Sequence, residues 1–291
     1  MTVLEVIQRS TDFLAKKGVD SPRLQVELLL AHVLAQPRLK LYLNFERVLS
    51  EPELNRVREL VQRRAQREPL QHIIGSTSFC GLELAVNRHV LVPRPETEQL
   101  AESGWLFLNS LPPSPTALDF GTGSGCLAIT LAVKCPTAQF TALDISADAL
   151  AAARQNAARH QVESRVNFFA GDCFAAITPN QQFNLIISNP PYIPGPEIAS
   201  LEPEVRDFDP RPALDGGADG LDFYRRLSRE AGHFLAPGGQ IMLEFGDGQA
   251  EPVKKLFAEQ MWIVEAVKAD YSGRPRILIA HQSKPAARDS K

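Results

Sequence analysis

The sequence predicts an α/β protein whose larger part is a doubly wound, mostly parallel β-sheet. Three observations predict it: short apolar segments alternate with helical ones after Pro115, a glycine-rich loop follows the first apolar segment, and the second ends in an aspartate. The expected strands are TALDF, FTALD, VNFFAGD, FNLIISN and QIMLEFG, followed by a closing pair, WIVEAV and RILIAH. A short Tyr-Ser-Gly-Arg-Pro connection joins that pair, which indicates an antiparallel hairpin at the edge of the sheet.

Helices are expected between these strands. One runs up to about Lys134, one runs from Ser146 to His160, and one lies near residues 220–235. A short helix should follow the third strand, and another should precede the closing pair. This alternation makes the chain from residue 93 to residue 282 one α/β domain, and the polar residues 283–291 are expected to be disordered.

Residues 1–70 predict a small all-helical domain. Three helices are expected to begin at capping signals, which are Thr2 with Glu5, Ser21 with Pro22, and Ser50 with Glu53. The second helix is expected to bury the face that carries Leu24, Leu28, Ala31 and Leu34. Residues 71–92 are expected to form a hairpin linker, with strands near His72–Gly75 and Leu82–Val86.

Arginines gather on the third helix, opposite its apolar stripe, at Arg56, Arg63, Arg64 and Arg67. A solvated helix face is the favoured interpretation, and a docking surface for a partner is the alternative. Residues 1–70 carry 12 Lys and Arg against 9 Asp and Glu, so the remainder of this chain of net charge −3 holds a balance of −6. An acidic α/β domain argues against an enzyme that grips duplex DNA through its phosphates.

Composition excludes several classes of protein. No apolar run approaches the roughly 20 residues that span a bilayer, and the first residues lack the features of a secretory signal. The four cysteines and six histidines show no metal-binding spacing, so neither a metal site nor a disulfide framework is expected. We therefore expect a soluble cytoplasmic protein without metal, without a membrane association and without stably bound nucleic acid.

The glycine-rich loop Gly121, Thr122, Gly123, Ser124 and Gly125 is the candidate cofactor site. It lacks the third glycine of the dinucleotide fingerprint, because Cys126 occupies that position, so it suits a cofactor without a pyrophosphate. Asp144 at the end of the second strand could accept hydrogen bonds from the ribose hydroxyls of an adenosine. Asp172 at the end of the third strand could accept from the adenine amino group, although an aspartate that caps a turn would look the same.

The fourth predicted strand ends in Asn189, Pro190, Pro191 and Tyr192, which form the candidate catalytic turn. Two prolines stiffen the backbone and prevent the strand from continuing. The side-chain oxygen of Asn189 and the carbonyl of Pro190 are two fixed acceptors for the hydrogens of a planar amide or amino group, and Tyr192 offers a flat surface. Such acceptors would help a delocalised nitrogen to attack the sulfonium methyl of S-adenosylmethionine.

Longer stretches of the chain resemble a known family. DFGTGSGCLAIT, ALDIS, SNPPYI, VPRPETE, ALDGGADGLDFYRRL and LAPGGQIMLEFG, together with the N-terminal SPRLQVELLLAHVL, are similar to the peptide chain release factor N5-glutamine methyltransferases (HemK/PrmC). The resemblance implies a Rossmann-like class I S-adenosylmethionine-dependent methyltransferase domain with a seven-stranded sheet, preceded by a helical domain that docks the substrate. It also implies that the glutamine of a release factor's Gly-Gly-Gln motif is the methyl acceptor.

The same resemblance implies roles for individual residues. Gly121 to Gly125, Asp144, Cys173 and Asn189 would line the cofactor, and Asn189 to Tyr192 would hold the glutamine amide. Cys173 stands where a bulky aromatic residue is common in the family, so Phe174 is the expected cover for the adenine ring. Arg94 and Glu96 are expected to shape the hinge beside the pocket or to pair at the start of a helix.

Three other functions are compatible with parts of the pattern. A DNA adenine-amino methyltransferase is the main alternative, because Asn-Pro-Pro-Tyr serves that chemistry equally well, and a guanine-N2 RNA methyltransferase is a weaker one. A cofactor-binding protein without catalysis is disfavoured by the intact turn. The loop from Ala213 to Gly220 is expected to place acidic groups near the site, which disfavours nucleic acid. We expect a monomer.

Overall fold

The computed structural model describes residues 1–282, so the tail predicted for residues 283–291 lies outside the described residues. Contacts between residues divide the chain into two units. One consists of Met1–Ser76 together with Glu202–Phe208, and the other of Thr77–Leu201 with the chain from Asp209 onward. The domain limits expected at residues 70 and 92 stay a prediction. Within the described residues, no helix is both long and apolar enough to cross a membrane.

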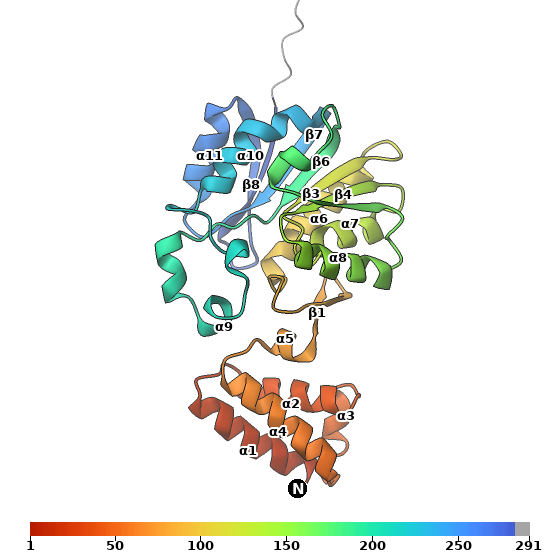
Figure 1. Cartoon of the computed structure of the whole chain (residues 1–291), viewed down its shortest axis with the longest axis vertical. Coiled ribbons are helices and arrows are strands. Elements are labelled where there is room, and N and C mark those ends of the chain that lie inside the picture. Colours follow the sequence, from red (N-terminus) through yellow and green to blue (C-terminus); the bar gives the residue numbers. More distant parts are fainter. Residues whose placement is uncertain (283–291) are drawn as a thin grey trace, which may run out of the picture. The chain divides into compact units, whose positions relative to one another are not determined.

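The smaller unit contains the helices α1 (Val3–Lys16), α2 (Pro22–Val33), α3 (Leu39–Tyr42), α4 (Glu51–Ala65), α5 (Leu70–Ile74) and α9 (Pro203–Arg206) (Figure 1). The predicted starts of α1, α2 and α4 are confirmed, although the Ser21 side chain makes no capping hydrogen bond. Thr2 with Glu5 and Ser50 with Glu53 form complete capping boxes, in which each side chain bonds the other residue's backbone N–H. Ser21 and Pro22 stand at the N-cap and the first turn of α2.

The buried face predicted for α2 is confirmed at Ala31, which is buried, and wrong at Leu24. Leu24 is 42% exposed, whereas Val26, Leu29 and Leu30 are buried. The helix PRLQVELLLAHV is apolar around most of its circumference, so its periodicity does not select one face. The buried face also contains Glu27, whose carboxylate accepts hydrogen bonds from Arg23, Arg38 and Tyr42, and these bonds offset the cost of burying its charge.

The strand predicted at His72–Gly75 is also wrong, because residues 70–74 form the helix α5. Pro69 precedes the helix, and Gly75 follows it with φ of +84°, which is the usual arrangement of proline before and glycine after a helix. The short apolar run between them is compatible with either structure by its composition alone. Local proline and glycine signals decide in favour of the helix.

The arginine face of α4 is not simply solvated. Arg64 is 4% exposed and donates to Gln25 and to Glu204, at 2.6 Å for the latter. Arg67 binds both carboxylate oxygens of Glu204 at 2.6 Å, whereas Arg56 pairs only with the exposed Glu59 of its own helix. These bonds attach residues 202–208 to the helices of the smaller unit, so two of the four arginines bind a segment of their own chain.

The larger unit contains a two-stranded hairpin and a seven-stranded sheet of order β5-β4-β3-β6-β7-β9-β8. The hairpin strands are β1 (Ser76–Phe79) and β2 (Leu82–Ala85). The sheet strands are β3 (Thr116–Phe120), β4 (Gln139–Asp144), β5 (Val166–Ala170), β6 (Phe183–Ser188), β7 (Leu235–Glu244), β8 (Trp262–Ala269) and β9 (Pro275–Gln282). β3 to β7 pair in parallel, and β9 pairs antiparallel with both β7 and β8. The predicted α/β fold and its antiparallel closing pair are confirmed.

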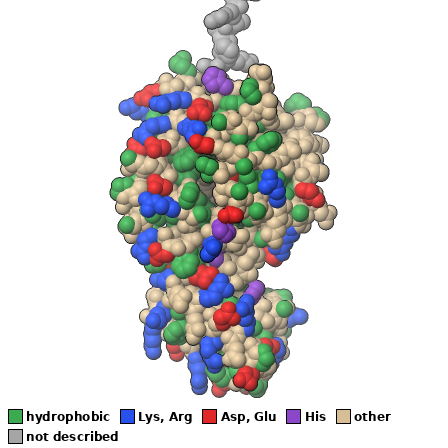
Figure 2. Space-filling model, viewed as in Figure 1, with side chains coloured by type: hydrophobic (Ala, Val, Ile, Leu, Met, Phe, Trp, Pro, Cys, Tyr) green, Lys and Arg blue, Asp and Glu red, His purple; other side chains and the backbone are tan. Residues whose placement is uncertain are grey.

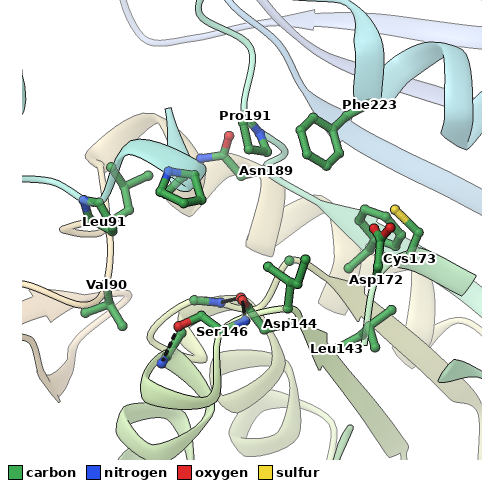
Figure 3. Close-up of a pocket in the computed structure, with 18 of the residues that line it drawn as sticks. Val90, Leu91, Leu143, Asp144, Ser146, Asp172, Cys173, Asn189, Pro191 and Phe223 are labelled. Carbon is green, nitrogen blue, oxygen red and sulfur yellow. Dashed lines mark hydrogen bonds between the residues drawn. The ribbon is translucent and has the colours of Figure 1, made fainter. Parts of the chain in front are cut away.

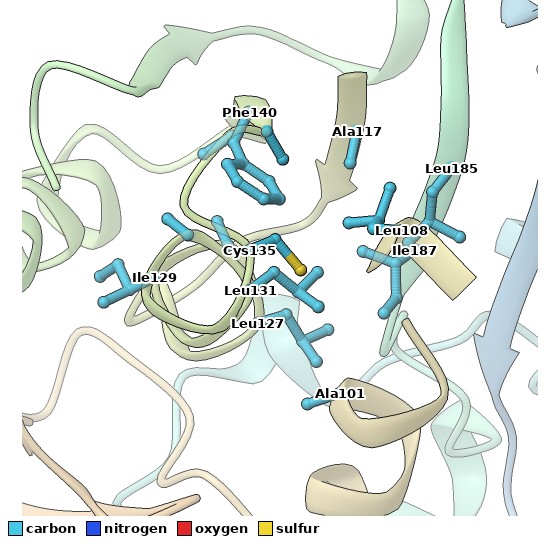
Figure 4. Close-up of a cluster of buried hydrophobic side chains, with 14 of the residues drawn as sticks. Ala101, Leu108, Ala117, Leu127, Ile129, Leu131, Cys135, Phe140, Leu185 and Ile187 are labelled. Carbon is cyan, nitrogen blue, oxygen red and sulfur yellow. The ribbon is translucent and has the colours of Figure 1, made fainter. Parts of the chain in front are cut away.

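Helices cover both faces of this sheet, as Figure 1 shows. One face packs against α6 (Pro95–Asn109), α7 (Cys126–Lys134) and α8 (Ala147–Arg159), and the other against α10 (Asp222–Glu230) and α11 (Ala250–Glu259). Successive strand residues serve opposite faces: Leu185 and Ile187 join the α6–α7 core drawn in Figure 4, and Ile186 joins the other core. A parallel sheet buried on both faces requires such continuous apolar strands.

The strand order also determines where a ligand can bind. From β3 the chain proceeds through α7 to β4 on one side, whereas β6 pairs with β3 on its other side. In open α/β sheets a crevice forms at the carboxyl ends of the strands where the order reverses in this way. The loops that follow β3, β4 and β6 therefore meet at one place, and these are the loops that carry the predicted glycines, Asp144 and the predicted catalytic turn.

Candidate active site

A cavity of about 350 Å³ lies at the carboxyl ends of β3 to β6 (Figure 3). From these strand ends it is lined by Phe120, Gly121, Gly123, Leu143, Asp144, Ile145, Ser146, Gly171, Asp172, Cys173, Asn189 and Pro191. The structure thus brings seven of the predicted site residues to one cavity: Gly121, Gly123, Asp144, Asp172, Cys173, Asn189 and Pro191. Thr122, Ser124, Gly125, Phe174, Pro190 and Tyr192 do not line it.

The glycine loop approaches the cavity with bare backbone. Gly121 and Gly123 have φ of +74° and +55°, and a Cβ placed on either would meet no atom within 4 Å. Glycine is suited to both positions because other residues are strained at positive φ. A side chain there would also project into the space beside the loop that a ligand could occupy. The loop is held from behind by Asp119, which accepts from the Thr122 hydroxyl at 2.7 Å and from the Ala128 N–H at 3.0 Å.

The remaining predicted loop residues support the loop from within. Gly125, with φ of +81°, precedes α7, and a Cβ there would lie 2.6 Å from the Ile129 side chain. Ser124 is 2% exposed, and its carbonyl accepts from the buried Asn156 amide at 2.9 Å. We assign Thr122, Ser124 and Gly125 to the shape of the loop and leave direct contact with a ligand to Gly121 and Gly123.

Asp144 holds the first two loops together. One carboxylate oxygen accepts from the Gly123 N–H at 2.8 Å, and the other from the Ser146 N–H at 2.9 Å. The Ser146 hydroxyl in turn accepts from the Ala149 N–H, so Ser146 caps α8 and Asp144 is not needed for that role. A carboxylate oxygen can accept more than one hydrogen bond, so Asp144 keeps acceptor capacity at the cavity wall.

Apolar side chains form much of the remaining wall. Val90, Leu91, Cys173 and Phe223 face the cavity in Figure 3, and Ile145 also lines it. Ile145 is 67% exposed, although it follows directly on a buried strand. An exposed isoleucine in a cavity wall is suited to cover the face of a flat aromatic ring, because such contact removes its apolar surface from water.

The third strand end departs from expectation at Phe174. This ring is 4% exposed and stacks on Phe234 with centroids 4.7 Å apart, so it belongs to the core and does not support the adenine contact expected of it. Asp172 does line the cavity, and its carboxylate also accepts from Arg226 at 2.8 Å. Hydrogen bonding from the Cys173 thiol, aided by Arg226, lowers the pKa of Asp172, so an ionised acceptor is maintained there.

The turn after β6 holds Asn189 through a defined network. Ser188 is buried and its hydroxyl donates to the Phe120 carbonyl, which joins the turn to β3. The Asn189 side-chain nitrogen donates to the Thr97 hydroxyl at 3.1 Å, and that hydroxyl donates to a carboxylate oxygen of Glu244 at 2.7 Å. Asn189 lines the cavity, and among the described residues no donor bonds its Oδ1, so this oxygen keeps its capacity to accept.

Pro190 is buried and Tyr192 is partly buried beside this turn. The Tyr192 carbonyl accepts from the Gln249 side chain at 2.9 Å, which fixes the backbone after the second proline. Burial raises the pKa of Tyr192 to about 12, and Glu244 adds to the increase. The phenol is therefore neutral in the physiological range and can serve as a flat, uncharged surface, as the sequence predicts, but not as a base.

Glu244 ends β7 with its side chain 1% exposed, and burial raises the pKa of this carboxyl from 4.5 to about 7. Because this pKa is higher in the folded state than in the unfolded state, ionisation of Glu244 lowers the free energy of unfolding. The contribution of the protonated carboxyl to that free energy is fully present below pH 4.5 and is lost as the pH rises through about 7. We expect Glu244→Gln to raise the melting temperature relative to wild type by more at about pH 8 than at about pH 5. Thermal unfolding at both values measures it, with the exposed Glu259→Gln as the control. An unchanged difference between the two pH values would contradict the raised pKa.

Several lining residues escaped the sequence predictions. His89, Val90 and Leu91 come from the segment between the hairpin and α6, and Pro210, Pro212, Ala213 and Asp215 from the long loop after the catalytic turn. Of the acidic groups that the loop from Ala213 to Gly220 is expected to place near the site, Asp215 lines the cavity and Asp219 does not. Arg94 pairs with the buried Asp209 at 2.8 Å, so it holds the start of that loop and does not pair with Glu96.

Comparison with known proteins decides the family. A family model described as the PrmC N-terminal domain matches residues 5–75, and one described as the methyltransferase small domain matches residues 98–201. A release factor glutamine methyltransferase from Geobacter sulfurreducens is 46% identical over 257 residues, which are 88% of this chain and 88% of the relative. The chain belongs to the release factor glutamine methyltransferase family.

Further relatives agree with this assignment. A release factor glutamine methyltransferase from Chlorobaculum tepidum is 42% identical over 93% of this chain and 94% of its own length. The crystal structure of a methyltransferase from Pyrococcus furiosus, 21% identical, matches with a TM-score of 0.51 over 75% of this chain and 97% of that one, which shows the shared fold. This member of the release factor glutamine methyltransferase family is thus a class I S-adenosylmethionine-dependent methyltransferase, as predicted.

The residues at the cavity fit S-adenosylmethionine. The volume of about 350 Å³ lies in the range of small-molecule sites. Asp144 offers a carboxylate suited to ribose hydroxyls, Ile145 an apolar surface suited to adenine, and Gly121 a backbone that no side chain shields. Within residues 1–282, no cluster of three or more His, Cys, Asp or Glu side chains is placed to hold a metal ion.

Proposed function

We propose that this enzyme transfers the methyl group of S-adenosylmethionine to the side-chain amide nitrogen of the glutamine in the Gly-Gly-Gln motif of peptide chain release factors. One observation supports this assignment above the others: Asn189 lines the same cavity as Asp144 and has its side-chain nitrogen engaged by Thr97, which leaves Oδ1 as an acceptor. The family membership supports the choice of acceptor. Because the substrate would be a translation factor, the proposal also places the reaction in the cytoplasm.

The chemistry follows from the electronic structure of an amide. Its nitrogen is a weak nucleophile because the lone pair is delocalised into the carbonyl group. Asn189 Oδ1 and the Pro190 carbonyl would accept hydrogen bonds from the two N–H bonds of the substrate amide and increase the electron density on nitrogen. Bound S-adenosylmethionine supplies an electrophilic methyl on a positively charged sulfur. The new C–N bond forms as the S–C bond breaks, and the proton lost by nitrogen passes to water.

The rate enhancement expected from these residues is mainly positional. Asn189 is held by Thr97, and the backbone that follows the two prolines is held at Tyr192 by Gln249, so the turn is organised before the substrate arrives. Tyr192 would support the plane of the amide. The reaction as proposed needs no base before methyl transfer. The high pKa of Tyr192 is therefore compatible with its role as a flat surface for the amide.

The distribution of charge disfavours the DNA adenine-amino alternative. In Figure 2, basic and acidic side chains lie intermixed on the face shown. On α10, Arg225 pairs with Asp219 and Asp222, and Arg226 pairs with Asp172 and Glu230. Binding to DNA phosphates depends on cations that are not already neutralised by neighbouring carboxylates.

A transfer assay tests the proposed substrate. Purified enzyme is incubated with S-adenosylmethionine labelled in its methyl group and either a release factor, the same factor with its Gly-Gly-Gln glutamine replaced by alanine, or unmethylated duplex DNA. The expected result is label on the intact release factor alone, located on the glutamine by mass spectrometry of the peptide. Label on DNA, or equal label on the altered release factor, would overturn the proposal.

The helical unit is proposed to dock the release factor, supported by the match of residues 5–75 to the PrmC N-terminal domain. Arg64 and Arg67 already bind Glu204, so we assign docking to other residues of that unit. The exposed Arg56 and Arg58 on α4 are candidates, since the ion pair of Arg56 with Glu59 is itself exposed and therefore weak. Their joint replacement by glutamate should raise KM for the release factor while leaving the Kd for S-adenosylmethionine unchanged, and an unchanged KM would remove them from this role.

A further inference from the structure

Three side chains from distant parts of the sequence form a hydrogen-bonded series behind the catalytic turn. Thr97 lies in the first turn of α6, Glu244 ends β7, and Asn189 follows β6. The Thr97 hydroxyl donates to Glu244 at 2.7 Å and accepts from the Asn189 side-chain nitrogen at 3.1 Å. Thr97 and Glu244 are 2% and 1% exposed, so water does not substitute readily for either partner.

The direction of each hydrogen bond follows from the chemistry of the groups. Above its raised pKa of about 7 the Glu244 carboxylate is ionised and only accepts, so the single hydrogen of the Thr97 hydroxyl is directed to Glu244. The Thr97 oxygen then has only lone pairs to offer to Asn189 and must face a donor. This requirement selects the orientation of Asn189 in which NH₂ faces Thr97. In the flipped orientation Asn189 Oδ1 would face the Thr97 oxygen with no hydrogen between them.

We propose that Thr97 is a positioning residue, which uses Glu244 as its fixed acceptor to hold the Asn189 carboxamide with Oδ1 free for the substrate. The inference rests on the proposed function, since it assigns the reason why Asn189 can accept from the glutamine amide. The Glu244 carboxylate also accepts directly from the Asn189 side chain, so the Thr97 hydroxyl is the second of two acceptors for this NH₂ group. Without the Thr97 hydroxyl the amide would be held by one acceptor, and a larger fraction of molecules would present NH₂, a donor, where the substrate N–H requires an acceptor.

The test compares Thr97→Val, which removes the hydroxyl at nearly constant volume, with Thr97→Ser, which keeps it. At about pH 8.5, where Glu244 is ionised, we expect Thr97→Val to lower kcat by about 10-fold, with KM for the release factor and Kd for S-adenosylmethionine within about threefold of wild type. Thr97→Ser should restore kcat to within about threefold of wild type. Thr97→Ala provides a second variant without the hydroxyl, with the same expected loss, if Thr97→Val does not fold.

A matched control is Thr130→Val on α7. Thr130 is fully buried in the same unit, and among the described residues its hydroxyl has no hydrogen-bond partner. This variant removes the same atoms from a core position without affecting Asn189, so kcat should equal that of wild type. A similar loss of kcat in Thr130→Val and Thr97→Val would mean that any threonine-to-valine change in this core disturbs activity, and would overturn the inference.

A double-variant cycle separates positioning from general support of the fold. If Thr97 acts through Asn189, adding Thr97→Val to Asn189→Ala should cause no further loss of kcat. An additional loss of about 10-fold in that background, or wild-type kcat in Thr97→Val alone, would overturn the inference. These outcomes differ from a failure of the proposed function, which would appear as no transfer to the release factor by the wild-type enzyme.

Discussion

Replacing Asn189 by alanine is expected to lower kcat for release factor methylation by about 10²-fold or more, the effect of losing one preorganised polar group at a reacting centre. The Kd for S-adenosylmethionine should stay within a few-fold of wild type, because the Asn189 side chain is one of many residues at the cavity and is anchored to Thr97. Single-turnover transfer of labelled methyl measures the chemical step, and calorimetric titration measures cofactor binding.

The control for this variant is Asn167→Ala. Asn167 lies exposed on β5, in the same unit, and does not line the cavity. Its replacement should leave both kcat and Kd unchanged. Near-normal turnover in Asn189→Ala would remove this residue from catalysis, whereas a loss of cofactor binding as large as the loss of turnover would assign it to the cofactor instead.

Much of the fold could be predicted because its signals are local. Apolar strands of five or six residues, helix caps such as Thr2 with Glu5, and the loop beginning at Gly121 depend on neighbours in sequence, and each was confirmed. The errors have different origins. The helix at residues 70–74 was missed although local proline and glycine signals mark it, whereas the burial of Arg64 depends on Glu204, 140 positions away.

The site shows the same division. Asp144 and Asn189 were predictable because each ends a parallel strand, and the ends of neighbouring strands must meet at one edge of the sheet. Phe174 was expected to cover adenine because Cys173 stands where a bulky aromatic residue is common in the family, but the Phe174 ring stacks on Phe234 in the core. The roles of Thr97 and Glu244 could not be predicted from the sequence, because they arise only from contacts with Asn189 in the folded chain.

Replacing Asp144 by alanine is expected to weaken S-adenosylmethionine binding by about 10- to 100-fold, which corresponds to the loss of hydrogen bonds to a charged group worth about 1.5–3 kcal/mol. The carboxylate also joins the Gly123 and Ser146 N–H groups, so Asp144→Asn should bind nearly as weakly, because its NH₂ would oppose one of these donors. Calorimetric titration measures each Kd, with the exposed Glu163→Ala as the control, and an unchanged Kd in Asp144→Ala would exclude the residue from the site.

A cofactor analogue distinguishes direct contact with the ribose from organisation of the loops. If Asp144 binds the ribose hydroxyls, an S-adenosylhomocysteine analogue that lacks both hydroxyls should bind wild type weakly and lose little further affinity in Asp144→Ala, because the interaction is already absent. If Asp144 acts only by holding Gly123 and Ser146, the variant should lose affinity for the analogue and for the parent compound by the same factor. We expect the first result, since a carboxylate whose oxygens each accept one backbone hydrogen keeps lone pairs for a ligand at the cavity wall.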